Sequence, residues 1–245
     1  MSPHFYSTLL LGLVAAGANI VGGYSLSYPR VVDRLLLTIL IALGAGFLLA
    51  ATFVVAVPTS VELTPHTPWI LLAGYLFVQF FQHTLAPHFH FGEETHPERH
   101  TQAHVGNTAV LGIMLHAFFD GTLIASGFAV SRRIGILLFV AVLLHKIPEG
   151  FTAASIMRAA GRSQRVARLS SELIAAATFL GIVLVSFASG TVRYALPFSA
   201  GVTLYVAASD LIPEVNKEER AWVSGVVFLG VLCYFVTDRL LDLLL

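Results

Sequence analysis

The chain carries two copies of one motif, each with a histidine four residues before a carboxylate. The first copy, LHAFFDG, pairs His116 with Asp120, and the second, LHKIPEG, pairs His145 with Glu149. Residues four apart lie on one face of an α-helix, so each copy presents an imidazole beside a carboxylate. Such ligands suit divalent metal ions of intermediate softness. Two such faces turned towards each other would form a metal site with two imidazole and two carboxylate ligands.

The alternative is that these histidines only pack. A single histidine in an apolar helix is more often a hydrogen-bonded core residue than a ligand. Here the same spacing occurs twice, and both copies lie inside long apolar stretches. A buried carboxylate needs a compensating charge, and an ionisable residue at membrane depth indicates function. The repetition therefore favours a metal site.

Composition places the motifs in a membrane protein. Charged residues make up 11% of the 245 residues and hydrophobic residues 56%, whereas soluble domains carry about 25% charged residues. The mean hydropathy is +0.81. Eight spans of about 20 residues fit this length, so we expect one transmembrane domain over residues 1–245. The 14 basic and 14 acidic residues balance, which argues against a nucleic-acid partner.

Apolar runs predict an all-α bundle of eight transmembrane helices. The first run begins without Lys or Arg and no evident cleavage site follows it, so we expect a span and not a signal peptide. Pro148 precedes Glu149 directly and is expected to kink the fifth span, and Pro58 and Pro213 predict similar breaks. The expected spans are Phe5–Ser27, Leu35–Pro58, Trp69–Thr84, Val105–Val130, Ile134–Met157, Ser170–Gly190, Tyr194–Pro213 and Ala221–Leu241.

Basic residues in the connections predict the orientation. Cytoplasmic loops carry an excess of Lys and Arg, which places both termini outside the cytoplasm, in a cell (inner) membrane. The connections from the third to the fourth, the fifth to the sixth and the seventh to the eighth span are then cytoplasmic. The richer set is Arg30, Arg34, Arg99, Arg158, Arg162, Arg165, Arg168, Lys217 and Arg220, and the poorer set is Arg132, Arg133, Arg193 and Arg239.

The cytoplasmic connection at about residues 85–104 is rich in histidine. Neutral imidazoles on a polar loop can bind metal ions weakly and exchangeably. The alternative is a solvated loop in which histidine is frequent by chance. The candidate loop ligands are His88, His90, His96, His100 and His104.

Three further carboxylates are candidates for the path of a cation. Glu62 lies at the outer end of the second span, and Asp210 and Glu214 lie at the cytoplasmic end of the seventh. Glu214 stands beside a charged run, so an ordinary solvated helix end explains it equally well. Gln82, on the third span, is expected to have a packing or interfacial role.

Together the motifs resemble those of the ZIP (Zrt-, Irt-like protein) divalent metal transporters. LHAFFDG and LHKIPEG resemble the motifs of the fourth and fifth helices, and SAGVTLYVAASDLIPEV resembles the seventh. GAGFLLAATFVVAVPTSVE is a looser match to the second. The resemblance implies eight helices in a 3+2+3 inverted-repeat bundle with the metal site between helices four and five. It also implies metal entry from the extracytoplasmic side and release to the cytoplasm.

Two positions in the central pair of helices depart from the family pattern. The resemblance implies that His116, Asp120, His145 and Glu149 form the principal transport site. Family members with two metals usually have Asn after the helix-four histidine, and Asn or Asp after the first helix-five ligand. Ala117 and Lys146 occupy these positions here, so we expect the Lys146 ammonium to replace a second cation. The alternative is that Lys146 extends along its helix to an interface.

The sequence therefore predicts a transporter of divalent cations, most simply zinc, into the cytoplasm. It predicts no cofactor besides the transported metal, a lipid bilayer as surroundings and a possible homodimer. The ligand set does not separate zinc from iron, manganese, cobalt or cadmium. An intramembrane zinc hydrolase is the alternative. It is disfavoured because catalytic zinc usually keeps three protein ligands and one open position.

Overall fold

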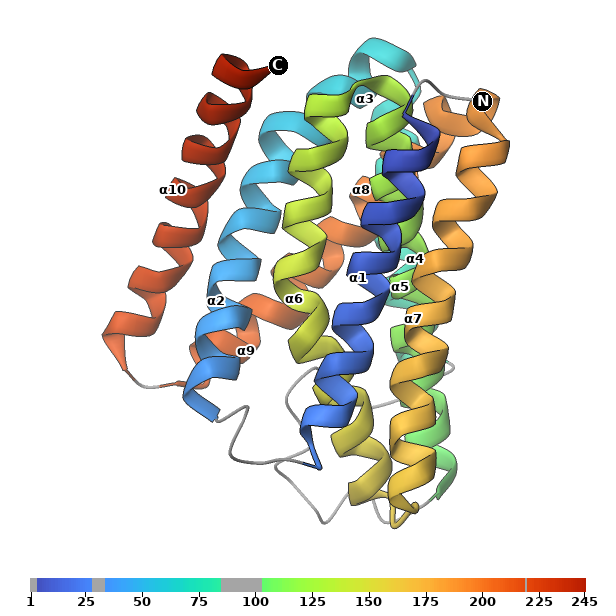
Figure 1. Cartoon of the computed structure of the whole chain (residues 1–245), viewed down its shortest axis with the longest axis vertical. Coiled ribbons are helices and arrows are strands. Elements are labelled where there is room, and N and C mark those ends of the chain that lie inside the picture. The colour runs from blue at the N-terminus through green and yellow to red at the C-terminus, as the bar shows by residue number, and fades with distance from the viewer. Residues whose placement is uncertain (1–3, 28–33, 85–102, 219) are drawn as a thin grey trace.

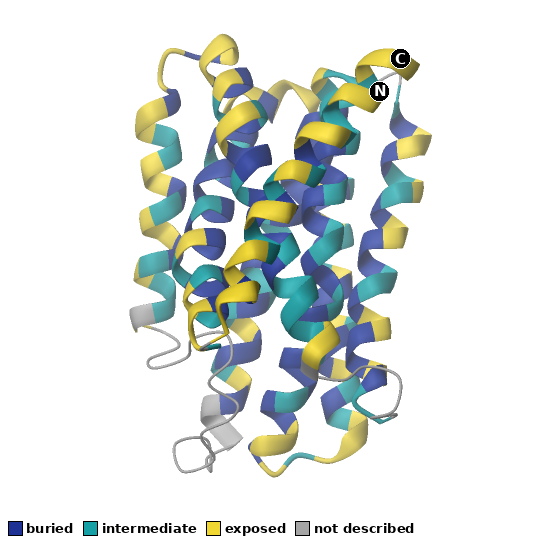
Figure 2. Cartoon of the chain, turned by 90° about the vertical axis from the view of Figure 1, so that its left-hand side faces the viewer, coloured by how far each residue is buried: buried dark blue, intermediate teal, exposed yellow. Residues whose placement is uncertain are grey.

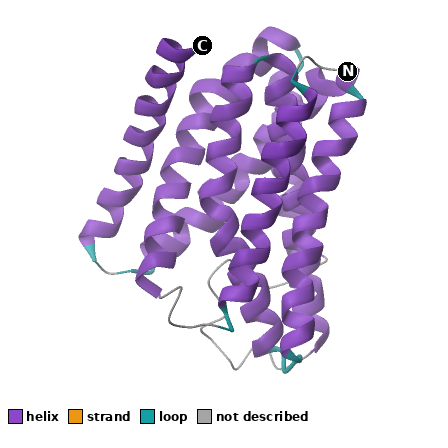
Figure 3. Cartoon of the chain, in the orientation of Figure 1, coloured by secondary structure: helices purple, strands orange, loops and turns teal. Residues whose placement is uncertain are grey.

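The computed structural model of the chain is a bundle of long helices (Figure 1). It describes residues 4–27, 34–84, 103–218 and 220–245. Within these ranges the regular structure is entirely helical (Figure 3), which confirms the predicted all-α class. The helices are α1 (Phe5–Ser25), α2 (Arg34–Ala51), α3 (Val57–Leu63), α4 (Thr67–Thr84), α5 (Ala103–Val130), α6 (Arg132–Ala159), α7 (Gln164–Phe187), α8 (Val192–Tyr205), α9 (Ile212–Asn216) and α10 (Ala221–Leu244).

Seven helical stretches of the described chain are long and apolar enough to cross a bilayer. They are Phe5–Ser25, Leu35–Leu63, Gly106–Val130, Arg132–Ala159, Gln164–Phe187, Ser189–Asn216 and Ala221–Leu244. The expected third span corresponds to α4, which is not among them. Its C-terminal part contains Gln79, Gln82 and His83, and these polar residues lower its hydropathy.

Two of the predicted proline breaks are π-helical turns. The segment η1 (Thr52–Ala56) joins α2 to α3 just before Pro58, and η4 (Val206–Leu211) joins α8 to α9 just before Pro213. Proline lacks an N–H group and its ring displaces the carbonyl four residues earlier. A widened turn accommodates the ring, so both helices continue to Leu63 and Asn216 instead of ending at the proline. Helix α6 also continues through Pro148.

Pairs of glycines bring the helices into close contact. In four helix pairs, each helix has a glycine where an added Cβ atom would overlap a backbone carbonyl oxygen of the other helix. Small residues allow such close approach between membrane helices. The pairs are Gly22 with Gly150 in α1 and α6, Gly121 with Gly181 in α5 and α7, Gly46 with Gly230 in α2 and α10, and Gly74 with Gly201 in α4 and α8.

Exposed residues lie on the outside of the bundle, while buried residues face its interior (Figure 2). Many of the exposed residues are large and apolar. Helix α10 shows this most clearly, since only 17% of its most apolar stretch is buried. Phe228 and Leu243 on this helix are 76% and 83% exposed. An apolar outer surface suits hydrocarbon surroundings, as expected for a membrane protein.

The crossing of α1 and α6 can be tested at Gly22. Gly22→Ala would place a methyl group on the Ile147 carbonyl oxygen, and overpacking of this kind costs roughly 1–3 kcal/mol. We expect the midpoint of thermal unfolding in detergent to fall by roughly 2–10 °C. Gly17→Ala is the matched control on the same helix, because nothing lies within 4 Å of its added Cβ. An equal fall in both variants would contradict the close crossing.

Candidate metal centre

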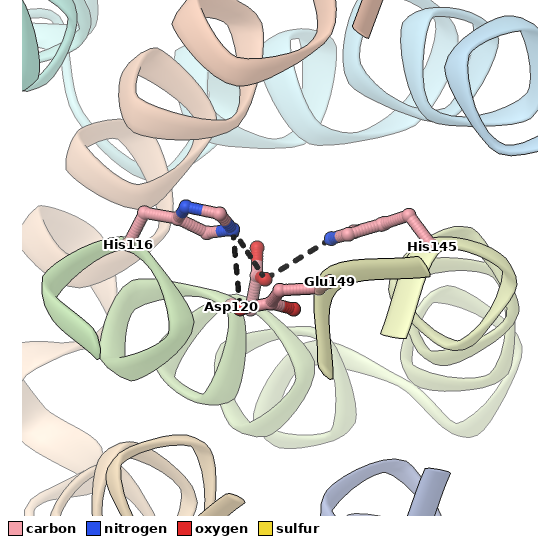
Figure 4. A group of neighbouring side chains, drawn as sticks. All are labelled: His116, Asp120, His145 and Glu149. Atoms are coloured by element: carbon pink, nitrogen blue, oxygen red, sulfur yellow. Dashed lines mark hydrogen bonds and ion pairs between the residues drawn. The ribbon is translucent and has the colours of Figure 1, made fainter. Parts of the chain in front are cut away.

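Helices α5 and α6 bring the two repeated motifs face to face (Figure 4). One ligand atom from each of His116, Asp120, His145 and Glu149 lies within 4.8 Å of the others. All four residues are buried, with at most 3% of their surface exposed. His116 and His145 reach the carboxylates from opposite sides (Figure 4). The arrangement expected from the sequence is therefore present in the geometry.

The distances between nitrogen and oxygen atoms in this cluster suit a cation between them. The Nε2 atom of His145 lies 3.2 Å from Asp120 Oδ2, and its Nδ1 atom lies 3.2 Å from the carbonyl oxygen of Ala141. A proton on Nδ1 is donated to that carbonyl, which leaves the Nε2 lone pair facing the carboxylate. Two lone pairs that face each other at this distance favour a cation as their common partner.

The other histidine faces the second carboxylate. His116 Nε2 lies 3.5 Å from Glu149 Oε1 and 3.6 Å from Asp120 Oδ2. Neither His116 Nε2 nor Glu149 Oε1 has a hydrogen-bond partner among the described residues. Buried polar atoms nearly always have a partner, so such a pair calls for a water molecule or an ion. A divalent cation fits the chemistry of this donor set.

Lys146 points into the same cluster. Its Nζ atom lies 2.7 Å from Asp120 Oδ2 and 2.6 Å from Glu149 Oε2, and the side chain is fully buried. The alternative that Lys146 extends to an interface is therefore wrong. The equivalent position after the other histidine is Ala117, which is also fully buried and offers no ligand atom. The role of Lys146 as a substitute cation stays a prediction.

Asp210 lies apart from the four-residue cluster, buried in the π-helical turn η4. The side-chain amide of Gln82 donates to Asp210 Oδ2 at 3.1 Å and accepts from the hydroxyl of Tyr205 at 2.9 Å. The packing role expected for Gln82 thus includes a hydrogen bond to a buried carboxylate. This amide holds a buried carboxylate, and its two different partners determine its orientation.

The other two candidate path residues lie in more exposed surroundings. Glu214 in α9 forms an ion pair with Lys217 at 2.8 Å, with side chains 22% and 47% exposed. This contact matches the alternative of a solvated helix end. Glu62 in α3 is exposed. Their participation in a cation path stays a prediction.

The histidine-rich connection lies almost wholly outside the described residues. His88, His90, His96 and His100 belong to the range 85–102, which is not described. His104 is in the first turn of α5, and its side chain is not described. Metal binding by these histidines therefore stays a prediction from the sequence.

Asn19 of α1 is a buried polar residue that the sequence reasoning missed. Its side chain is fully buried, and neither amide atom has a hydrogen-bond partner among the described residues. The Asn19 backbone contacts Gly150, the residue after Glu149. An Asn inside an apolar run is the signal that could have drawn attention to it. Its position places an amide-bearing residue beside the helix that supplies half of the cluster.

A membrane bundle with a buried cluster of two histidines and two carboxylates defines a metal-handling membrane protein. Comparison with known proteins makes this more specific. A family model described as ZIP Zinc transporter matches residues 87–238, more than half of the chain. This chain belongs to the ZIP zinc transporter family.

Individual relatives agree with this membership. Zinc transporter ZIP9 of Micropogonias undulatus is 30% identical over 158 residues, which cover 60% of this chain and 50% of that protein. Zinc transporter ZIP9-B of Xenopus laevis is 28% identical over 193 residues, covering 71% and 63%. Zinc transporter ZIP13 of Gallus gallus is 33% identical over 129 residues, covering 49% and 34%. The matched region thus spans between about a third and two thirds of these relatives.

The ligand assignment predicts a loss of metal binding on truncation of one imidazole. His145→Ala removes the Nε2 atom beside Asp120 and leaves a bound cation one ligand short. Loss of an outer-sphere partner of a metal ligand costs roughly 10- to 100-fold in metal affinity. We expect loss of the ligand itself to lower zinc affinity in detergent by at least as much. Isothermal titration calorimetry measures this change. His66→Ala, which alters an exposed histidine before α4, should leave the affinity unchanged, and equal behaviour of the two variants would refute the assignment.

Proposed function

We propose that this protein transports divalent metal cations, zinc foremost, across a membrane towards the cytoplasm. The observation that carries the proposal is the buried cluster of His116, Asp120, His145 and Glu149, with ligand atoms within 4.8 Å of one another. Membership of a zinc transporter family supports the same conclusion. The four side chains would replace the hydration shell of the cation, and no covalent chemistry is needed.

The ligand set favours exchange over permanent retention. A transported ion must be bound well enough to enter the site and weakly enough to leave it. Asp120 Oδ2 lies near both imidazoles and the Lys146 ammonium group. A metal ion bound here would therefore share this oxygen with the ammonium group. Competition for one oxygen would weaken its bond to the metal ion and assist release.

We assign α4, the expected third span, as one further crossing beside the seven apolar stretches. The two ends of the described chain lie at the same end of the bundle (Figure 1), which supports an even number of crossings. Seven apolar stretches meet the requirements of length and hydropathy, so α4 would be the remaining crossing. It packs against α8 through Gly74 and Gly201, which would shield its polar side chains from lipid.

The four glycine pairs support a 3+2+3 inverted repeat. Gly121 and Gly150 are the last residues of the two repeated motifs, and each contacts one outer helix, α7 or α1. The same distance along the chain separates Gly46 from Pro58 and Gly201 from Pro213, with a π-helical turn in both intervals. Helices α1 to α4 would then correspond to α7 to α10, with α5 and α6 as the central pair. Transport sites between such repeats are common in secondary transporters.

The distribution of Lys and Arg supports extracytoplasmic termini in a cell (inner) membrane. Asp210 and the Gln82 amide would then lie on the cytoplasmic side of the cluster, where they offer oxygen atoms to a departing cation. Glu62 would lie at the opposite end. A homodimer remains an additional prediction from the sequence. The family membership disfavours an intramembrane hydrolase.

Transport through this cluster can be tested with purified protein in liposomes. Glu149→Ala removes a carboxylate that contacts His116 and Lys146, so we expect zinc uptake to fall to the background of empty vesicles. Glu172→Ala is the control. This glutamate also lies in an apolar helix, but it accepts a hydrogen bond from Tyr24 at the surface, so uptake should persist. Undiminished uptake by a folded Glu149→Ala protein would refute the site.

The histidine-rich connection can be tested by deletion. We expect removal of residues 89–102 to preserve folding and leave zinc uptake measurable, because this polar sequence would tune metal delivery at the cytoplasmic mouth. Replacing the same residues with a Gly/Ser linker of equal length controls for the shortened connection. Complete loss of uptake at normal membrane expression, in both versions, would place the loop in the transport path.

A further inference from the structure

Lys146 brings a fixed positive charge to the carboxylates of the candidate metal centre. Its buried ammonium group lies 2.7 Å from Asp120 Oδ2 and 2.6 Å from Glu149 Oε2. We propose that Lys146 is a tethered counter-cation that lets the empty carrier cross the membrane, and that the centre consequently takes one divalent cation at a time. This inference rests on the proposed transport function and adds a mechanism for the return of the empty site.

The contacts show that the lysine and a metal ion can share Glu149. Lys146 contacts Oε2, while Oε1 faces His116 Nε2 at 3.5 Å. These last two atoms have no hydrogen-bond partner among the described residues, so they mark the side on which a cation can enter. The ammonium group and the entering ion thus use different oxygens of one carboxylate, and Lys146 can stay in place.

Asp120 is where the two cations compete. Its Oδ2 atom lies 2.7 Å from Lys146 Nζ and 3.2 Å from His145 Nε2. A divalent ion bound between His145 and Asp120 would draw this oxygen away from the ammonium group. When the ion leaves, the ammonium group can recover the oxygen. The tether keeps this replacement cation permanently available.

The net charge of the buried centre explains how the Lys146 ammonium group helps the empty state. With ionised carboxylates, a protonated lysine and neutral imidazoles, the empty centre carries −1 and the loaded centre +1. Without the lysine these charges would be −2 and 0. The idealised Born cost of burial rises with the square of the charge, so the lysine lowers the cost of the empty state roughly fourfold. It raises the cost of the loaded state in return.

Because the lysine lowers the burial cost of the empty centre and raises that of the loaded centre, it affects net uptake and metal exchange differently. Net uptake requires the empty centre to return, whereas exchange between metal on the two sides uses only loaded crossings. The lysine therefore assists the step that only net uptake needs. A second divalent ion at the same carboxylates would also stand beside the ammonium group, and the repulsion between like charges disfavours it.

The test compares net uptake with exchange in proteoliposomes. Radioactive zinc entering zinc-free vesicles measures net uptake, and radioactive zinc entering vesicles preloaded with unlabelled zinc measures exchange. In Lys146→Met we expect the ratio of net uptake to exchange to fall by about tenfold or more, because the empty centre now carries −2. Lys146→Arg retains the charge and should keep a ratio close to that of the original protein. Equal ratios in the original protein and Lys146→Met, or equal losses in Met and Arg variants, would overturn the inference.

A second measurement does not depend on any variant folding. Anomalous scattering from crystals of the unaltered protein grown with zinc should show one zinc ion at the four-residue cluster. Two zinc ions there would overturn the inference. If the unaltered protein shows neither net uptake nor exchange, the proposed transport function fails instead. A protein that transports zinc with two ions in its centre would retain that function and lose only the role of Lys146.

Discussion

Two carboxylates buried in an apolar bundle are the constraint on which the rest of the structure depends. Asp120 and Glu149 are at most 1% exposed, so water offers them little stabilisation. The cost of burying such charges is offset only by nearby cations and hydrogen-bond donors. His116, His145 and Lys146 all converge on them. The centre is therefore selective for positive charge before any particular metal is considered.

Close helix packing encloses this centre. Gly150 follows Glu149 and contacts the Asn19 carbonyl, and Gly121 follows Asp120 and contacts the Thr178 carbonyl. Larger residues at either glycine would separate the outer helices α1 and α7 from the pair that supplies the ligands. A less tightly packed centre would be more hydrated, and its attraction for a cation would weaken as the local dielectric constant rises. The glycines thus contribute to function through packing.

The sequence predicted those parts that depend on spacing within one helix. The helical class and most helix boundaries follow from periodicity, and each His/carboxylate pair follows from the repeated motif. That the two pairs meet was inferred from their repetition, because each buried carboxylate needs a compensating charge. The contact between Gln82 and Asp210 joins residues 128 positions apart, and burial of Asn19 depends on how α1 crosses α6. Spacing within one helix carries no information on such crossings. The π-helical turns were missed because proline predicts a disturbed helix but not how the chain accommodates it.

The difference between the two motif copies is as informative as their likeness. Both have a histidine, a carboxylate and a closing glycine, yet the residue after the histidine is alanine in one copy and lysine in the other. A lysine in both copies could neutralise both carboxylates and leave little attraction for a metal ion. Two alanines would leave two uncompensated charges in the empty centre. One lysine is the intermediate case, and its position between Asp120 and Glu149 spreads a single charge over both ligands. In the proposed mechanism, this single lysine balances the binding of metal against the return of the empty carrier.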